Sequence, residues 1–165
     1  MSFVVQKYGG SSVGTLEKIG KVADRVARCR ANGMSLVVVV SAMQGETDRL
    51  IGLAHGIDER ADLRETDQLL ATGEQVSAAL LAIALKKRGV PAVSLTAPQM
   101  KLRTDGVFSR ARIKSVDRTA IDEALRAGAV VVATGFQGID DDGNLTTLGR
   151  GGGLQQALLK FHGSL

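Results

Sequence analysis

Two kinds of hydrophobic pattern alternate along the chain. Residues 36–40 and 129–134 are short, continuous apolar runs rich in β-branched residues, which is typical of strands buried on both faces of a parallel sheet. Between Thr15 and Gly33 the apolar residues recur every three or four positions, which predicts a helix that Thr15 caps and that Asn32-Gly33 ends. The alternation of strand and helix predicts an α/β sandwich with a mainly parallel central sheet.

The rest of the chain continues this alternation. Further strands are predicted at residues 3–6, 91–95 and 145–148, further helices near residues 45–54, 65–88 and 118–126, a hairpin at 102–113, and a polar turn at 140–144. The face expected to pack in the long helix consists of Leu69, Gly73, Val76, Leu80 and Ile83. We find no repeat, low-complexity segment or linker, and a length of 165 residues fits a single domain.

Composition narrows the possible partners. The formal net charge of +4 comes from basic residues scattered over helices, and aromatic residues make up only 3%, so nothing favours a nucleic-acid partner. Cys29 is the only cysteine, which excludes an internal disulfide. No apolar run approaches the roughly 20 residues of a membrane span, and the N-terminus does not resemble a signal peptide. We therefore expect a cytoplasmic protein with no membrane partner.

Small residues follow each of the predicted parallel strands. Gly9-Gly10, Ser41-Ala42 and Thr134-Gly135 all stand at carboxyl ends, where sheets of this kind bind ligands. His55 and His162 are solitary and lack Cys or carboxylate neighbours at metal spacing, so we predict no metal site formed by the protein itself.

The first candidate site follows the first strand. Lys7 ends the strand, and Gly9, Gly10 and Ser11 come next, so backbone N–H groups and a positive charge could hold phosphate oxygens. The segment is not a P-loop, because it does not end in Gly-Lys-Ser/Thr. A lysine that merely precedes a tight turn explains the same residues equally well.

Two further segments carry candidate residues. In residues 149–153, Arg150 stands among glycines, and its planar side chain suits a carboxylate or a phosphate; a flexible connector is the alternative. Gly73 lies inside the long predicted helix, where glycine costs about 1 kcal/mol relative to alanine, which indicates close packing or a ligand. Glu74, beside it, could receive an ammonium group, although by itself an exposed helix carboxylate is the simpler interpretation.

Taken together, these segments resemble the N-terminal part of the aspartate kinases. The matching segments are residues 5–13, 37–43, 45–48, 71–77, 135–138 and 143–152. The resemblance covers residues 1–152 in order and spacing, and several motifs in register are far more specific than one glycine loop. It implies an amino-acid kinase domain with a three-layer α/β/α sandwich, present here in incomplete form. Another amino-acid or carbamate kinase on the same fold is the alternative, which residues 41–48 and 72–74 disfavour.

The resemblance also implies a reaction. ATP, which would carry Mg²⁺, would phosphorylate the side-chain carboxylate of L-aspartate to 4-phospho-L-aspartate, the first step of lysine, threonine and methionine biosynthesis. Lys7 would stabilise the transferring phosphoryl group, and Gly9, Gly10 and Ser11 would form the phosphate loop.

The substrate-binding residues come from the same resemblance. They would be Ser41, Thr47, Glu74 and Arg150, of which Arg150 would pair with a substrate carboxylate and Glu74 would hold the amino group. Positioning and charge neutralisation would supply the acceleration, because the substrate carboxylate is itself the nucleophile.

The similarity ends after Gly152. Gly153-Leu154 stands where the family has Ser-Asp, so residues 153–165 are predicted to be a divergent tail, and the regulatory domains are expected to be absent. Two interpretations follow: an aspartate kinase that forms homo-oligomers or associates with other kinase chains, or a truncated, inactive kinase-like protein that binds ligand or a full-length kinase subunit. We expect no turnover by the 165 residues alone.

Overall fold

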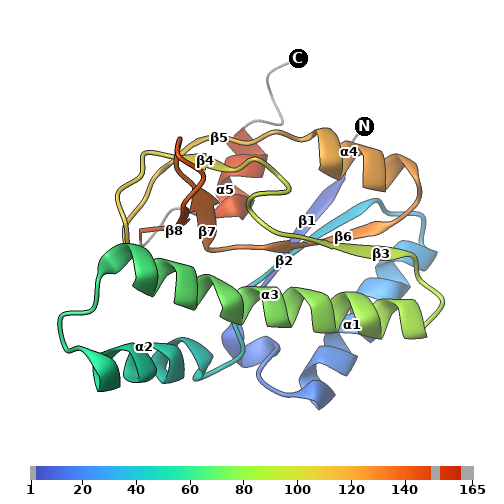
Figure 1. Cartoon of the computed structure of the whole chain (residues 1–165). Helices are drawn as coiled ribbons and strands as arrows, with labels where there is room; N and C mark the ends of the chain where they lie inside the picture. Colours follow the sequence, from blue (N-terminus) through green and yellow to red (C-terminus); the bar gives the residue numbers. More distant parts are fainter. Residues whose placement is uncertain (1–2, 150–152, 161–165) are drawn as a thin grey trace.

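A central parallel sheet organises the molecule. The computed structural model describes residues 3–149 and 153–160. Its main sheet, sheet A, has the spatial order β1-β2-β6-β3 with every neighbouring pair parallel (Figure 1). The strands are β1 (Val4–Tyr8), β2 (Leu36–Val40), β6 (Val130–Thr134) and β3 (Ala92–Leu95). All residues of β2 and β6 are buried, as their continuous apolar runs predicted.

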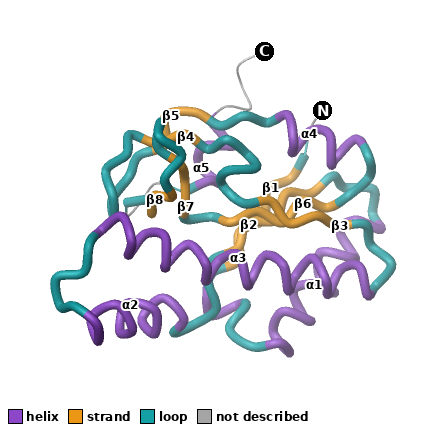
Figure 2. Tube along the Cα trace, in the orientation of Figure 1, coloured by secondary structure: helices purple, strands orange, loops and turns teal. Residues whose placement is uncertain are grey.

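Helices cover both faces of sheet A, and this confirms the predicted three-layer α/β/α sandwich (Figure 2). The helices are α1 (Leu16–Ala31) and α3 (Leu63–Lys87) on one face, and α4 (Thr119–Arg126) and α5 (Leu154–Lys160) on the other. Successive residues of β2 point into opposite cores: Val38 packs in the core beneath α1 and α3, whereas Val37 and Val39 pack in the core with α4 and α5.

A second, smaller sheet begins where sheet A ends. Sheet B has the order β5-β4-β7-β8, and its strands are β4 (Arg103–Thr104), β5 (Ile113–Ser115), β7 (Gln137–Ile139) and β8 (Leu145–Thr147). The antiparallel β4–β5 pair confirms the predicted hairpin. The strand β7 was not predicted. Only Gly135 and Phe136 separate it from β6, so the chain passes directly from the carboxyl end of a sheet A strand into sheet B.

The predicted packing face of α3 is partly wrong. Val76 and Ile83 are 47% and 62% exposed, whereas the buried face includes Asp67, Gly73 and Glu74. The reason is that α3 packs against both sheets as well as against α1 and α2, so it buries a wide face in which polar side chains meet sheet B. At Gly73 an added Cβ would lie 3.1 Å from Cβ of Ala42, so the mid-helix glycine is explained by close packing.

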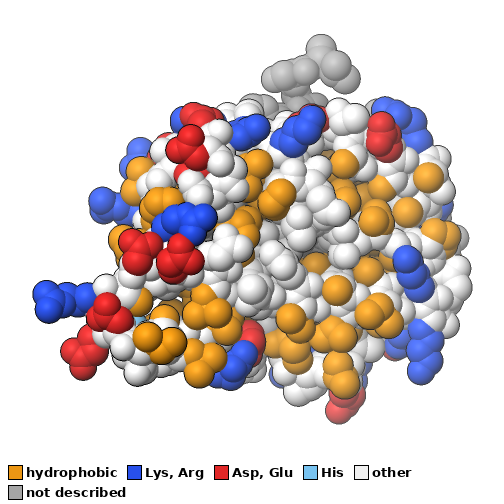
Figure 3. Space-filling model, in the orientation of Figure 1, with side chains coloured by type: hydrophobic (Ala, Val, Ile, Leu, Met, Phe, Trp, Pro, Cys, Tyr) orange, Lys and Arg blue, Asp and Glu red, His pale blue; other side chains and the backbone are white. Residues whose placement is uncertain are grey.

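The helix α2 (Glu46–Ile57) packs beside α3. Figure 3 shows hydrophobic side chains exposed on the side of the molecule that includes these two helices. The large hydrophobic residues Leu53 and Ile57 of α2 and Val76 and Ile83 of α3 are exposed. By length and composition α3 is the one helix, among those in the described residues, that could cross a membrane. In this fold it is instead a core helix that lies on sheet A.

Candidate functional site

Two adjoining cavities open at the carboxyl ends of β1, β2 and β6. The larger, of about 300 Å³, is walled by residues 41–45, by α3 at Leu70, Ala71 and Glu74, and by Phe136, Gln137 and Thr147. The smaller, of about 130 Å³, is lined by Lys7, Ser41, residues 135–136 and the start of α5. Ser41 and Phe136 belong to both walls, so the two cavities are neighbours.

The structure gathers most of the sequence-predicted residues here. Gly10, Ser41, Thr47 and Glu74 line the larger cavity, and Lys7 lines the smaller one. Five predicted residues from four separate segments thus meet at one edge of sheet A. This is the edge at which parallel sheets bind their ligands.

Three predicted residues are not part of this arrangement. Ser11 lines a separate open groove beside Lys18 and Arg25 of α1, so the structure does not place it in one cavity with Lys7. Gly9 lines neither of the two adjoining cavities. Arg150 lies outside the described residues.

The wall formed by residues 41–45 depends on two glycines. Gly45 precedes α2 with φ +80°, a left-handed conformation that glycine adopts without a steric penalty. A Cβ on Gly10 would lie only 2.8 Å from the carbonyl oxygen of Ala42. The backbone N–H of Gln44 donates to the Gly10 carbonyl at 3.1 Å. Gly10 is therefore needed for the turn after β1 to pack against residues 42–44.

Glu74 is the buried acidic group of the larger cavity. Burial raises its pKa from 4.5 to about 7, although hydrogen bonds from the Phe136 N–H and the Gln137 amide, and the positive charge of Lys7, act in the opposite direction. The Phe136 nitrogen lies 3.0 Å, and the Gln137 amide nitrogen 3.4 Å, from the same Glu74 oxygen, Oε2. An ammonium group that entered the cavity would favour the ionised carboxylate.

Sequence reasoning missed Gln137. Its side chain is buried, and its Nε2 also donates to the Ala71 carbonyl at 3.0 Å, so it joins β7 to α3 directly beside Glu74. Its Oε1 has no hydrogen-bond partner among the described residues. The available signal was a polar residue within the small-residue segment that follows β6.

Sequence reasoning also missed a second buried carboxylate, Asp67, which is fully buried and bonds to Thr147 in the wall of the larger cavity. The signal was two acidic residues seven positions apart on α3, and hence on one helix face. Among the described residues, no group of three His, Cys, Asp or Glu side chains could hold a metal ion.

The fold and this site define a class of protein. The family model of the amino acid kinase family matches residues 2–159, so the chain belongs to that family. Within it, the chain is 57% identical to the aspartokinase of Pseudomonas aeruginosa and 55% identical to an aspartate kinase of Stutzerimonas stutzeri, over 152 residues in each case. These residues are 92% of this chain and 37% of each relative, so the chain spans well under half the length of the curated relatives it matches.

Solved structures give the same result. The aspartate kinase from Synechocystis superposes with a TM-score of 0.79 and 46% identity, over 95% of this chain and 25% of that one. Aspartokinase III of E. coli, in complex with aspartate and ADP, superposes with a TM-score of 0.73 and 26% identity, over 92% of this chain and 44% of that one. The fold is therefore that of the N-terminal portion of aspartate kinases.

Proposed function

We propose that the chain carries the amino-acid-binding part of an aspartokinase site. It would serve the ATP-dependent phosphorylation of L-aspartate to 4-phospho-L-aspartate. The observation that carries this proposal is Glu74, a buried carboxylate with a pKa of about 7 in the wall of a cavity that also contains Ser41 and Thr47. A positive partner stabilises the ionised form of a buried carboxylate, and the ammonium group of an amino acid supplies one.

The proposal assigns a role to each of the four predicted site residues Lys7, Ser41, Thr47 and Glu74. The substrate ammonium pairs with Glu74, and the hydroxyls of Ser41 and Thr47 bind the substrate carboxylates. Lys7, in the adjoining cavity, neutralises the γ-phosphoryl group of ATP. From the family resemblance, Arg150 would also pair with a substrate carboxylate, and Mg²⁺ would arrive with the nucleotide.

The chemical step needs no covalent bond to the protein. One oxygen of the substrate side-chain carboxylate attacks the γ-phosphorus, the bond from that phosphorus to the β–γ bridging oxygen breaks, and ADP leaves with the electron pair. The residues around the cavities act by positioning and by charge. Support for aspartate and a nucleotide as ligands comes from the E. coli relative, which was crystallised with aspartate and ADP.

Calorimetry with the 165-residue chain tests the binding half of this proposal. L-aspartate should bind, and succinate, which keeps both carboxylates but lacks the amino group, should bind at least tenfold more weakly, as expected for the loss of a buried charged hydrogen bond. Glu74→Gln should reduce this preference at least tenfold. Equal affinity for L-aspartate and succinate in the unsubstituted chain would contradict the assignment of Glu74.

A second candidate follows from the coverage of the relatives, because the chain matches only 37% of their length. The chain would then bind ligand without turnover, or associate with other kinase chains. An ADP-release assay with L-aspartate, in which hydroxylamine traps the acyl phosphate, tests this second candidate. We expect no turnover by the purified chain alone, and any hydroxamate formed would eliminate this second candidate. Participation in lysine, threonine and methionine biosynthesis and a cytoplasmic location belong to the first proposal.

A further inference from the structure

The helix α3 carries two buried carboxylates on one face, and they reach different strands of sheet B. Glu74 bonds at the start of β7, whereas Asp67 bonds to β8. Asp67 is completely buried. One of its oxygens, Oδ2, accepts from the backbone N–H of Ser109 and from that of Thr147, both at 2.8 Å. The other, Oδ1, accepts from the Thr147 hydroxyl at 2.7 Å.

This arrangement fixes the direction of the Thr147 hydroxyl. A carboxylate can only accept hydrogen bonds, so the hydroxyl hydrogen must point at Asp67. The oxygen of Thr147 then offers only lone pairs to any other partner. Thr147 is also part of the wall of the larger cavity, together with Glu74.

We infer that Thr147 is a specificity-determining residue whose hydroxyl oxygen accepts a second hydrogen bond from the substrate ammonium group, and that Asp67 is the positioning residue that sets this polarity. The inference rests on the proposed function. An ammonium group has three donors, of which Glu74 takes one and Thr147 another. A ligand that presents an acceptor at this point would face the lone pairs of Thr147 and would be rejected.

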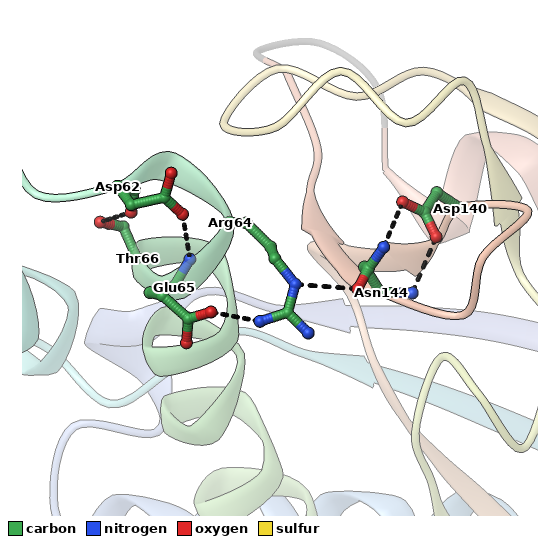
Figure 4. A network of polar contacts seen from close by, with 6 residues as sticks. All are labelled: Asp62, Arg64, Glu65, Thr66, Asp140 and Asn144. Carbon is green, nitrogen blue, oxygen red and sulfur yellow. Dashed lines mark hydrogen bonds and ion pairs between the residues drawn. The ribbon is translucent and has the colours of Figure 1, made fainter.

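A separate contact holds the same two elements together from outside the cavity. Arg64, at the start of α3, donates from Nε to Oδ1 of Asn144 at 2.9 Å (Figure 4). The backbone N–H and side-chain amide of Asn144 donate in turn to the carboxylate of Asp140, at 2.7 and 2.9 Å (Figure 4). This chain of contacts joins α3 to the β7–β8 turn, and none of its three residues lines the larger or the smaller cavity. It therefore offers a control for purely structural effects.

Four variants distinguish the effect of the direction of the Thr147 hydroxyl on binding from a purely structural effect. Thr147→Val removes the hydroxyl but keeps the backbone N–H bond to Asp67, and Thr147→Ser restores the hydroxyl. In Asp67→Asn the side-chain oxygen can still accept both backbone bonds, while the amide would donate to Thr147 and reverse its hydroxyl. Asn144→Ala removes the Arg64 contact and the side-chain bond to Asp140, and neither bond involves a residue of the cavity wall.

Calorimetry with L-aspartate and with succinate, on the whole 165-residue chain, measures the effect. Thr147→Val and Asp67→Asn should weaken L-aspartate binding about tenfold or more, the value of one hydrogen bond to a charged group, and should change succinate binding little. Thr147→Ser and Asn144→Ala should bind L-aspartate like the unsubstituted chain.

The outcomes distinguish this inference from the proposed function. If Thr147→Val binds L-aspartate normally while Glu74→Gln does not, the role of Thr147 is overturned and the proposed function stands. If Glu74→Gln also binds normally, the proposed function fails. Should Asp67→Asn not fold, as judged by circular dichroism, the comparison of Thr147→Val with Thr147→Ser still decides, because neither substitution removes the Asp67 bonds to the backbone. Equal losses of L-aspartate and succinate binding in Thr147→Val would reduce Thr147 to a structural role and would also overturn the inference.

Discussion

The carboxylate of Glu74 accepts a hydrogen bond at 3.0 Å from the backbone N–H of Phe136, a residue 62 positions further along the chain. Phe136 lies between β6 and β7, so this bond joins the middle of α3 to the junction of the two sheets. Among the described residues that line the larger cavity, Glu74 is the only acidic one, and the backbone of the facing wall holds its side chain. Its position depends on the fold of sheet B as well as on α3.

Glu74 should make stability depend on pH. Its folded-state pKa of about 7 lies above the ordinary value of 4.5, so the folded chain binds a proton more tightly than the unfolded chain does. The corresponding stability is fully present below pH 4.5 and is lost as the pH rises through about 7, by at most about 3 kcal/mol. Urea unfolding of the unsubstituted chain and of Glu74→Gln at several pH values measures this.

As the pH rises from 5 to 8, the unsubstituted chain should lose unfolding free energy relative to Glu74→Gln. A constant difference over this range would show that Glu74 does not titrate there. Asp105→Asn is a suitable control, because hydrogen bonds from the backbone N–H groups of Arg112 and Val107 lower the pKa of Asp105, which is consequently ionised throughout this range.

Lys7 should influence the titration of Glu74. Its positive charge is one of the contributions that lower the pKa of Glu74, so Lys7→Met should raise that pKa further. An NMR titration that follows the side-chain carboxyl carbon of Glu74 measures the change. Lys87→Met, at the far end of α3, provides a matched loss of charge and should leave the midpoint unchanged. A lower pKa of Glu74 in Lys7→Met would contradict the placement of the Lys7 charge near Glu74.

Gly135 should not tolerate a side chain. An added Cβ would lie 2.6 Å from Cγ1 of Val39 and 3.2 Å from the carbonyl oxygen of Val40, so Gly135→Ala should destabilise the fold by about 1–3 kcal/mol through overpacking. Gly52→Ala is the matched control, because an added Cβ at this position in α2 meets nothing within 4 Å apart from its chain neighbours and the helix's own backbone. It should stabilise by up to about 1 kcal/mol, since alanine favours helix. Thermal melts of the two variants should therefore move in opposite directions.

Thr15 should contribute to stability as the N-cap of α1. Its hydroxyl oxygen accepts from the backbone N–H of Lys18 at 3.2 Å, so Thr15→Ala should cost about 1 kcal/mol in urea unfolding. Thr15→Ser retains the hydroxyl and should lose little. An equal loss in both variants would attribute the effect to the methyl group instead of the cap.

The elements of sheet A were predictable because local sequence determines them. The uninterrupted valines of β2 predicted a doubly buried strand, and Thr15 with Asn32-Gly33 predicted the bounds of α1, which runs Leu16–Ala31. In contrast, β7 has only three residues, one of them glycine, and its strand conformation depends on pairing with β4 and β8. No local pattern reveals that pairing.

The same limit applies to the site. Asp67 reads in the sequence as an ordinary polar helix residue, and its burial depends on Thr147, which lies 80 positions away. Val76 and Ile83 were placed in the core because a helical period does not indicate how wide the buried face is. The roles of Lys7, Ser41, Thr47 and Glu74 stay predictions that the measurements above can test, although the fold brings these residues to one edge of the sheet.

The shared wall of Ser41 and Phe136 has a thermodynamic consequence. Phe136 is 44% exposed and lines both cavities, so an occupant of either cavity that reorients its side chain changes the shape of the other. Two ligands that both reorient Phe136 cannot bind independently. If the first ligand changes the affinity of the second by some factor, the second ligand changes the affinity of the first by the same factor, because linkage is reciprocal.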